Sequence, residues 1–185
     1  NLGSTGNTKN PTSSTSNTST NPIVKTNELI QKQTIQLDKQ GLKRYGVISE
    51  NLLAVSKNGK KGFVNKNLKL VIPCNYDDVQ AFNAGYAGVK YKGRWTFINK
   101  NGYFITKNPT YQFLNVLPFS SSKLAPVQVN FEGVEKKWGY ISTNGNRAIP
   151  YRFDKAGVSI DFLFIKMEGN GRSLRGFIFN ITPIS

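Results

Sequence analysis

The feature of this sequence that most constrains its fold is a short pattern that occurs four times. In each copy a small residue is followed by an aromatic residue and then by a β-branched residue. The copies lie in GKKGFVNKNLKLVIP (59–73), KGRWTFINKNGYFITK (92–107), KKWGYISTNGNRAIP (136–150) and SLRGFIFNI (173–181). Their small residues, Gly62, Thr96, Gly139 and Gly176, are 34, 43 and 37 residues apart. Because one unit of this size cannot bury its own apolar face, the period predicts units that stack on one another.

Each unit is expected to form an antiparallel β-meander. Residues 97–99 and 103–105 are strand-like, and Asn101-Gly102 between them indicates a hairpin turn, since both residue types tolerate positive φ. Residues 143–145 repeat this turn, and residues 65–67 repeat it without the glycine. We therefore predict an all-β fold of about four meander repeats with incomplete terminal units. The repeats would form an open stack or a small barrel or propeller-like array.

The sequence divides into three parts. Residues 1–26 are a low-complexity tail or linker, because 16 of the first 22 residues are Ser, Thr or Asn and cannot offset the entropy of ordering. Residues 27–41 are a connecting segment that forms either a short helix, with Asn27 as N-cap and Gly41 at its end, or a strand. Residues 42–185 are the predicted β domain, in which residues 45–55 look like the second half of an earlier unit.

The motifs resemble the bacterial WG repeat, also called the KWG repeat. The stretch KGFVNKNLKLVIPCNYDDVQAFNAGYAGV (61–89) has the pattern of this family, and Trp138-Gly139 matches its name-giving pair. Trp95-Thr96 keeps only the tryptophan, and Arg175-Gly176 keeps only the glycine. The resemblance covers about residues 45–181. It implies a β-rich repeat protein of the kind found in secreted, surface or multidomain bacterial proteins, and it implies no enzymatic activity and no catalytic residues.

The residues provide little material for catalysis. The chain has no histidine, and Cys74 is the only cysteine, so a Ser-His or Cys-His pair and a multi-cysteine metal site are excluded. Asp77 and Asp154 share a repeat position just after an aromatic residue, and we expect them to accept hydrogen bonds from backbone N–H groups in turns. We predict that the chain is not an enzyme and uses no cofactor and no metal ion.

The net charge of +15 favours an acidic partner. Residues 57–107 carry ten Lys or Arg and two acidic residues. Lysine supplies 19 of the 25 basic residues, and arginine is the better ligand for phosphate, so nucleic acid is a less expected partner than an acidic glycan. No run of 18 apolar residues is present, so no transmembrane segment is expected. Because the sequence begins at Asn1, we expect a processed secreted protein or lipoprotein, outside the cell or at its surface.

Two functions follow from these observations. The first is protein–protein interaction or self-assembly, including a fibre or filament that uses the N-terminal tail, with the chain itself or another envelope or extracellular protein as partner. The second is binding of a polyanion through the basic face of residues 57–107. The candidate partner-binding residues are Lys60, Lys61, Lys66, Lys69, Lys92, Arg94, Trp95, Lys136, Lys137 and Trp138. The candidate glycosylation sites are Asn17 and Asn180, each in an Asn-x-Ser/Thr sequon.

Overall fold

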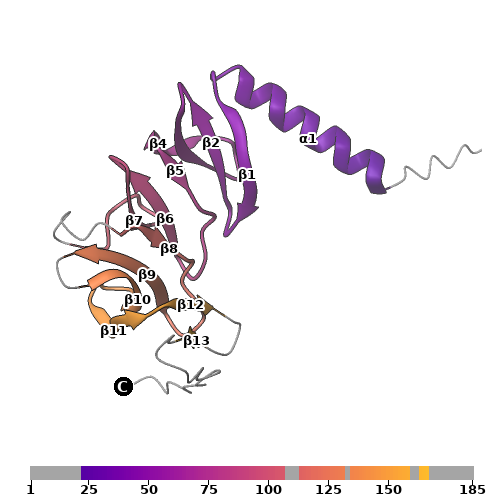
Figure 1. Cartoon of the computed structure of the whole chain (residues 1–185). Helices are drawn as coiled ribbons and strands as arrows, with labels where there is room; N and C mark the ends of the chain where they lie inside the picture. Colours follow the sequence, from indigo (N-terminus) through magenta and orange to yellow (C-terminus); the bar gives the residue numbers. More distant parts are fainter. Residues whose placement is uncertain (1–21, 107–112, 132–133, 159–162, 167–185) are drawn as a thin grey trace, which may run out of the picture.

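A computed structural model describes residues 22–106, 113–131, 134–158 and 163–166 (Figure 1). These residues form one helix, α1 (Pro22–Asp38), and four antiparallel sheets. The first sheet contains β1 (Lys43–Ser49), β2 (Leu52–Lys57), β3 (Lys60–Asn65) and β4 (Leu70–Tyr76). The second contains β5 (Asp78–Val79), β6 (Tyr86–Tyr91) and β7 (Arg94–Asn99). The third contains β8 (Asn115–Val116), β9 (Leu124–Phe131), β10 (Val134–Ser142) and β11 (Arg147–Phe153), and the fourth pairs β12 (Lys155–Val158) with β13 (Leu163–Lys166).

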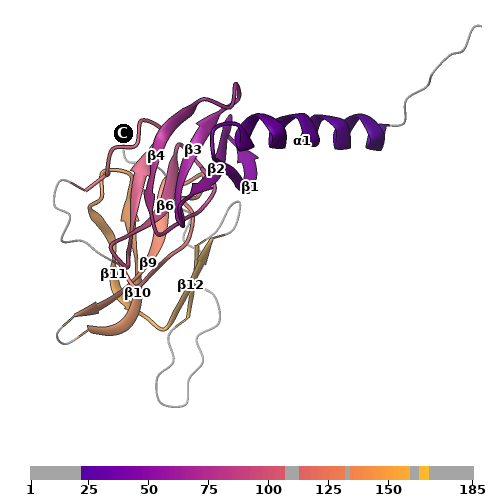
Figure 2. The ribbon, with the colours of Figure 1, turned by 90° about the horizontal axis from the view of Figure 1, so that it is seen from above.

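The prediction of an all-β meander fold is confirmed. Within each sheet the strands pair with their neighbours along the chain, and no described sheet closes on itself. The sheets follow one another in chain order, and α1 projects away from them at the N-terminal end (Figures 1 and 2). Of the two arrangements that the sequence left open, the described sheets adopt the open stack. Residues 1–21 of the predicted tail, both sequons and the fourth copy of the pattern lie outside the described residues, whereas residues 22–26 belong to α1.

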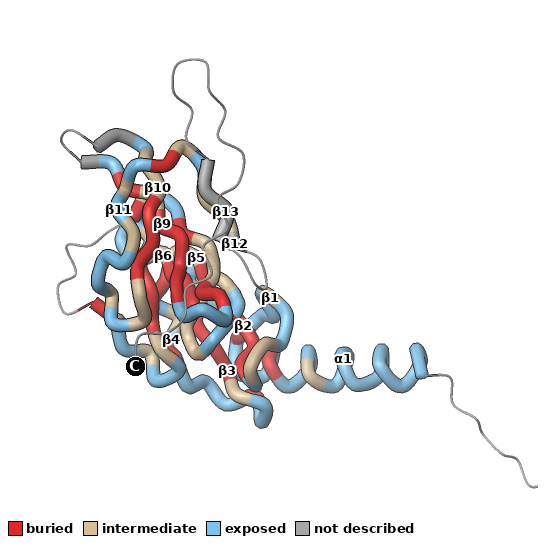
Figure 3. The backbone as a smooth tube through the Cα atoms, turned by 90° about the horizontal axis from the view of Figure 1, so that it is seen from below, coloured by how far each residue is buried: buried red, intermediate tan, exposed pale blue. Residues whose placement is uncertain are grey.

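The core lies between successive sheets, and buried residues run through the middle of the stack (Figure 3). In the first two units the aromatic residue of the repeat pattern packs against a phenylalanine that follows it in the chain. Phe63 of β3 meets Phe82 with ring centroids 4.9 Å apart, and Phe97 of β7 meets Phe119 at 4.8 Å. Both pairs are edge to face, which adds to the energy of burial. The units therefore depend on one another for their cores.

The glycine of the pattern is required by a close approach of the next strand. A Cβ added to Gly62 would lie 2.4 Å from the carbonyl oxygen of Ile72 and 2.8 Å from the nitrogen of Cys74. At Gly139 the same atom would lie 2.7 Å from the carbonyl oxygen of Ile149. The register between the two strands shifts at both glycines, as expected for a β-bulge. A side chain at either position would collide with this bulge.

The second unit, which has Thr96 in place of the glycine, shows how the chain avoids this collision. The residue before each of these positions pairs with an aromatic residue: Lys61 with Tyr76, Trp95 with Phe113, and Trp138 with Phe153. Gly62 and Gly139 each precede that aromatic residue by 14 positions, whereas Thr96 precedes it by 17. Between Thr96 and its aromatic partner the second unit thus has three more residues than the first and third units have. In those two units the next strand passes directly over the glycine.

The connecting segment forms a helix, but its start differs from the prediction. α1 begins at Pro22, so Asn27 lies inside the helix and is not its N-cap. Proline suits the first turn, because the N–H groups there have no partner within the helix. The helix was predicted from the spacing of its apolar residues, and this spacing does not show at which residue the first turn begins.

The end of α1 is close to the predicted position and anchors the helix to the sheets. Gly41 has a φ of 68°, its N–H donates to the carbonyl of Asp38 (2.9 Å), and the N–H of Leu42 donates to the carbonyl of Leu37 (3.0 Å). This pair of bonds is a Schellman motif. Leu37 and Leu42 are both buried against the outer face of the first sheet, together with Leu53, Val55 and Val64. The last turn of α1 therefore covers the face that a preceding unit would cover.

Residues 45–55 belong to the first sheet. They form β1 and β2, which pair with each other, and β2 pairs with β3 along its whole length. The first sheet thus joins the strands of the expected half unit, β1 and β2, to β3 and β4, which carry the Gly62 pattern and the residues after it.

Candidate functional site

The described residues contain no group of three His, Cys, Asp or Glu that could hold a metal ion. Cys74 is half-buried with its Sγ 4.0 Å from the carbonyl oxygen of Val55, and burial raises the pKa of its thiol. A raised pKa makes a thiol a poorer nucleophile at neutral pH. The exposed surfaces of the described residues are the remaining candidates for a functional site.

Two of the predicted partner-binding lysines are paired with aspartates of the same repeat. Lys60 forms an ion pair with Asp77, and Lys137 forms the equivalent pair with Asp154. Asp77 also accepts a hydrogen bond from the N–H of Gly93 (2.8 Å). The Lys60 hydrogen bond, followed by that from Gly93, lowers the pKa of Asp77. The expectation that Asp77 accepts from a backbone N–H is confirmed, and each aspartate in addition holds a lysine that could otherwise meet a partner.

The position just before the glycine holds Lys61, Trp95 and Trp138, all of which are half-buried. The ammonium of Lys61 donates to the carbonyl oxygens of Asp77 (2.8 Å) and Gly59 (3.2 Å) and lies 5.1 Å from the ring centroid of Tyr45. A long side chain with an apolar body and a polar end can cover the edge of a sheet in this way. These three residues thus occupy equivalent places along the stack, one in each unit.

The ten candidate residues do not form one patch. Lys60, Lys61, Lys92 and Arg94 lie at or beside the β2–β3 and β6–β7 turns, whereas Lys66 and Lys69 lie at the β3–β4 turn. Because β3 runs from one rim of the stack to the other, these two sets are at opposite rims. Lys136, Lys137 and Trp138 belong to β10 in the third sheet. The basic face of residues 57–107 is therefore divided between two rims.

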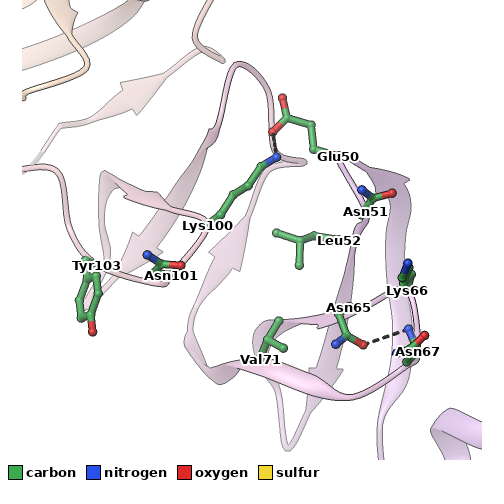
Figure 4. Close-up of a pocket in the computed structure, with 10 residues that line it drawn as sticks. All are labelled: Glu50, Asn51, Leu52, Asn65, Lys66, Asn67, Val71, Lys100, Asn101 and Tyr103. Carbon is green, nitrogen blue, oxygen red and sulfur yellow. Dashed lines mark hydrogen bonds and ion pairs between the residues drawn. The ribbon is translucent and has the colours of Figure 1, made fainter.

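The structure reveals a groove that the sequence reasoning did not identify. It lies between the turns of the first and second sheets and has a volume of about 710 Å³ (Figure 4). The β1–β2 turn, the β3–β4 turn and the turn after β7 surround it, and Leu52 and Val71 contribute apolar surface. The remaining lining residues are Glu50, Asn51, Asn65, Lys66, Asn67, Lys100, Asn101 and Tyr103. Of the predicted residues, only Lys66 is among them.

The signal for this groove in the sequence is the tripeptide Asn-Lys-Asn, which occurs at 65–67 and again at 99–101. In both copies the first asparagine supports the turn. Asn65 Oδ1 accepts from the N–H of Asn67 (3.0 Å), and Asn99 Oδ1 accepts from the N–H of Asn101 (3.0 Å). In the sequence these stretches indicate only hairpin turns. Their second function depends on the stacking of the two sheets, which places the turns beside each other.

Glu50 fixes the two sides of the groove to each other. Its carboxylate lies 2.9 Å from the ammonium of Lys100 and accepts from the N–H of Gly85 (3.1 and 3.2 Å). Burial raises the pKa of Glu50, but the bonds from Lys100 and from the Gly85 backbone outweigh it, and the pKa lies below its ordinary value of 4.5. Glu50 is therefore ionised at neutral pH and compensates the charge of Lys100.

The second exposed surface is α1 itself. Leu37 is the only residue of this helix that is buried, and its exposed fraction is 1%. Ile23 is 67% exposed and Ile30 is 42% exposed, although both lie on the same side of the helix as Leu37 at seven-residue intervals. No helix in the described part of the chain is long and apolar enough to cross a membrane. The apolar side of α1 is thus an exposed surface next to the stack.

The fold and the repeated turn, glycine and ion-pair geometry define a protein of the β-repeat class. Comparison with known families assigns it further: residues 62–95 and 138–170 match the model described as the WG containing repeat. Both matches lie on repeats that the motifs had marked, and they support assignment of the chain to the WG-repeat family. No curated protein and no solved structure gives a significant match to it.

Proposed function

We propose that this chain is a non-catalytic β-repeat protein that mediates protein–protein interaction through α1, and that the partner is a second copy of the chain. The observation that carries this proposal is the exposed apolar side of α1. The repeat stack supplies a rigid body to which the helix is fixed at its last turn by Leu37 and Leu42. The proposal extends to the cell envelope or extracellular space, which the Ser/Thr/Asn-rich residues 1–22 favour.

The stability of α1 provides the physical argument. The helix has 17 residues, and six of them are β-branched, which lowers helix propensity. Isolated helices of this length are marginal in water, and most helices in proteins are stabilised by packing. Leu37 is the only residue of α1 that is buried against the sheets, and Gln33 adds one side-chain hydrogen bond, which it accepts from Arg44 of β1 (3.4 Å). A second helix along the Ile23, Ile30 and Leu37 side would supply the missing contacts.

The seven-residue spacing favours an identical helix as the partner. Two helices that pack side by side place apolar residues of one heptad position against each other. Ile23 and Ile30 follow this spacing, and Leu37 continues it into the sheet contact. The intervening Thr26 and Gln33 are polar, so this pairing would be weak and concentration-dependent.

The test is the molar mass of the purified chain, measured by sedimentation velocity over a range of concentrations. The wild-type chain should exceed the monomer mass and dissociate on dilution. The double variant Ile23→Lys, Ile30→Lys should stay monomeric. The matched control Val24→Lys, Gln31→Lys adds the same charge at exposed positions with the same seven-residue spacing, about a quarter turn or more away from the stripe, and should behave as the wild type does.

Two results would overturn the proposal. A wild-type chain that is monomeric at every concentration and still shows the circular dichroism of a formed α1 would show that the helix needs no partner. An equal mass for the wild type and the Ile23→Lys, Ile30→Lys variant would place the interface elsewhere. Removal of residues 1–21 separates the tail from the helix: if α1 alone mediates association, the truncated chain associates over the same range of concentrations as the full chain.

A further inference from the structure

The groove between the first two sheets is built from two copies of one turn. In each copy the first asparagine is used to close the turn, and the lysine and the second asparagine remain for the surface. Lys66 and Asn67 lie on one side of the groove, and Lys100 and Asn101 lie on the other (Figure 4). The ion pair of Glu50 with Lys100 and the bonds from Gly85 to Glu50 hold these sides in place. The groove is therefore formed before any ligand enters.

The polar groups of the groove are available to a ligand. The side-chain amides of Asn67 and Asn101 make no hydrogen bond with another described residue, and both residues are exposed. Each amide carries two donor hydrogens and an acceptor oxygen. Such groups on opposite walls match a ligand with many hydroxyl groups, since neighbouring hydroxyls can donate to and accept from one amide.

The charge of the groove is a single uncompensated cation. Lys100 is neutralised by Glu50, whereas Lys66 forms no ion pair with a described residue. One isolated ammonium group matches a ligand with one carboxylate. Binding of nucleic acid requires several cations, because it neutralises a row of phosphates. The net charge of +15 would raise the local concentration of any anionic ligand.

Three residues give the groove its apolar surface: Tyr103 and Val71 on the two walls and Leu52 on the floor. Tyr103 is 69% exposed, Val71 is exposed in β4, and Leu52 lies buried between the two walls. An exposed tyrosine ring can cover the apolar C–H face of a sugar ring. The volume of about 710 Å³ falls within the roughly 300–1,000 Å³ of ligand pockets in proteins. Amides, one cation and one exposed aromatic ring together suit a carbohydrate.

We propose that this groove binds an acidic oligosaccharide that contains uronic acid. Lys66 pairs with a carboxylate of the ligand, Asn67 and Asn101 bind its hydroxyls, and Tyr103 covers one sugar ring. This site lies on the sheets and is independent of the association of α1, so either can fail without the other.

Isothermal titration calorimetry with tetragalacturonate tests this site. Its fully methyl-esterified form, which keeps the hydroxyls and lacks the charges, serves as the neutral ligand. The wild-type chain should bind the acidic ligand more tightly than the neutral one. Lys66→Gln should weaken binding of the acidic ligand by about tenfold and leave the neutral ligand unchanged, since a bond to a charged group contributes more than a neutral one. Asn67→Ala and Asn101→Ala should weaken both ligands by about fivefold each.

Lys43→Gln is the matched control, because it removes the same charge from an exposed position in β1 outside the groove. It should bind both ligands as the wild type does. Equal losses in Lys66→Gln and Lys43→Gln would show that binding follows net charge alone and would overturn the proposal. So would unchanged binding by Asn67→Ala and Asn101→Ala, or the absence of saturable binding at millimolar ligand. Thermal unfolding of each variant confirms that it is folded, and neither asparagine has a positive φ that alanine would strain.

Discussion

The close approach at Gly62 makes a quantitative prediction about stability. In Gly62→Ala the new Cβ would meet three atoms of the β4 backbone at 2.4, 2.7 and 2.8 Å. All three belong to the backbone of a paired strand, so none can turn aside as the end of a side chain can. Overpacking of this kind costs roughly 1–3 kcal/mol, and rigid backbone neighbours place this variant near the upper value. We expect Gly62→Ala to lose about 3 kcal/mol of unfolding free energy.

The assay is thermal unfolding followed by circular dichroism. For a chain of this size, 1 kcal/mol shifts the Tm by about 2–4 °C, so Gly62→Ala should lower it by about 6–12 °C. Gly46→Ala is the control, because its added Cβ would meet only the Cβ of Ala54, at 3.4 Å, which is an ordinary contact. The control should stay within about 0.5 kcal/mol of the wild type.

One result would refute this reasoning. If Gly62→Ala and Gly46→Ala unfold at the same temperature, the bulge in β4 yields to a side chain and the glycine serves another purpose. The second unit offers an internal check on the same argument. Thr96 already occupies the equivalent position, and Thr96→Gly should destabilise by about 1 kcal/mol because a buried side chain is lost and glycine weakens a strand.

Two further predictions concern titration. The pKa of Glu50 is lower in the folded chain than its ordinary 4.5, so its contribution to stability is present above that pH and is lost as pH falls through the folded pKa. Urea unfolding at a series of pH values should therefore show a decline below about pH 4.5 that is shallower in Glu50→Gln; an identical slope would contradict the role of the Lys100 and Gly85 bonds. Burial raises the pKa of Tyr140 to about 12. In absorbance titrations Tyr140→Phe should therefore remove a tyrosine that ionises near pH 12. If the variant instead loses a tyrosine that ionises near pH 10, Tyr140 is not buried as described.

The repeat frame could be derived from the sequence because its signals are local. A turn such as Asn101-Gly102 depends on the φ angles that its own residues tolerate, and the alternation of strands depends on neighbouring positions. The irregularity of the second unit is seen only in the structure. The sequence did not show that its three additional residues lie between Thr96 and Phe113, because that requires the pairing of Trp95 with Phe113.

The candidate site was harder to predict, because charge by itself does not reveal which lysines are compensated. Lys60 and Lys66 look alike in the sequence. The fold pairs Lys60 with Asp77, 17 residues away, whereas Lys66 stays without an ion pair among the described residues. The start of α1 was also missed, since the apolar spacing that marks a helix does not locate its first turn.

The sequence by itself determined the strands, their turns and the repeat period, since these depend on residues close together in the chain. Only the tertiary structure decided what the repeats do for one another. It placed Phe82 on Phe63, brought the Asn-Lys-Asn turns of two units to one groove, and used Leu37 to cover the outer face of the first sheet. These contacts join separate units, and their geometry is set by how the sheets stack, which no local pattern of residues specifies.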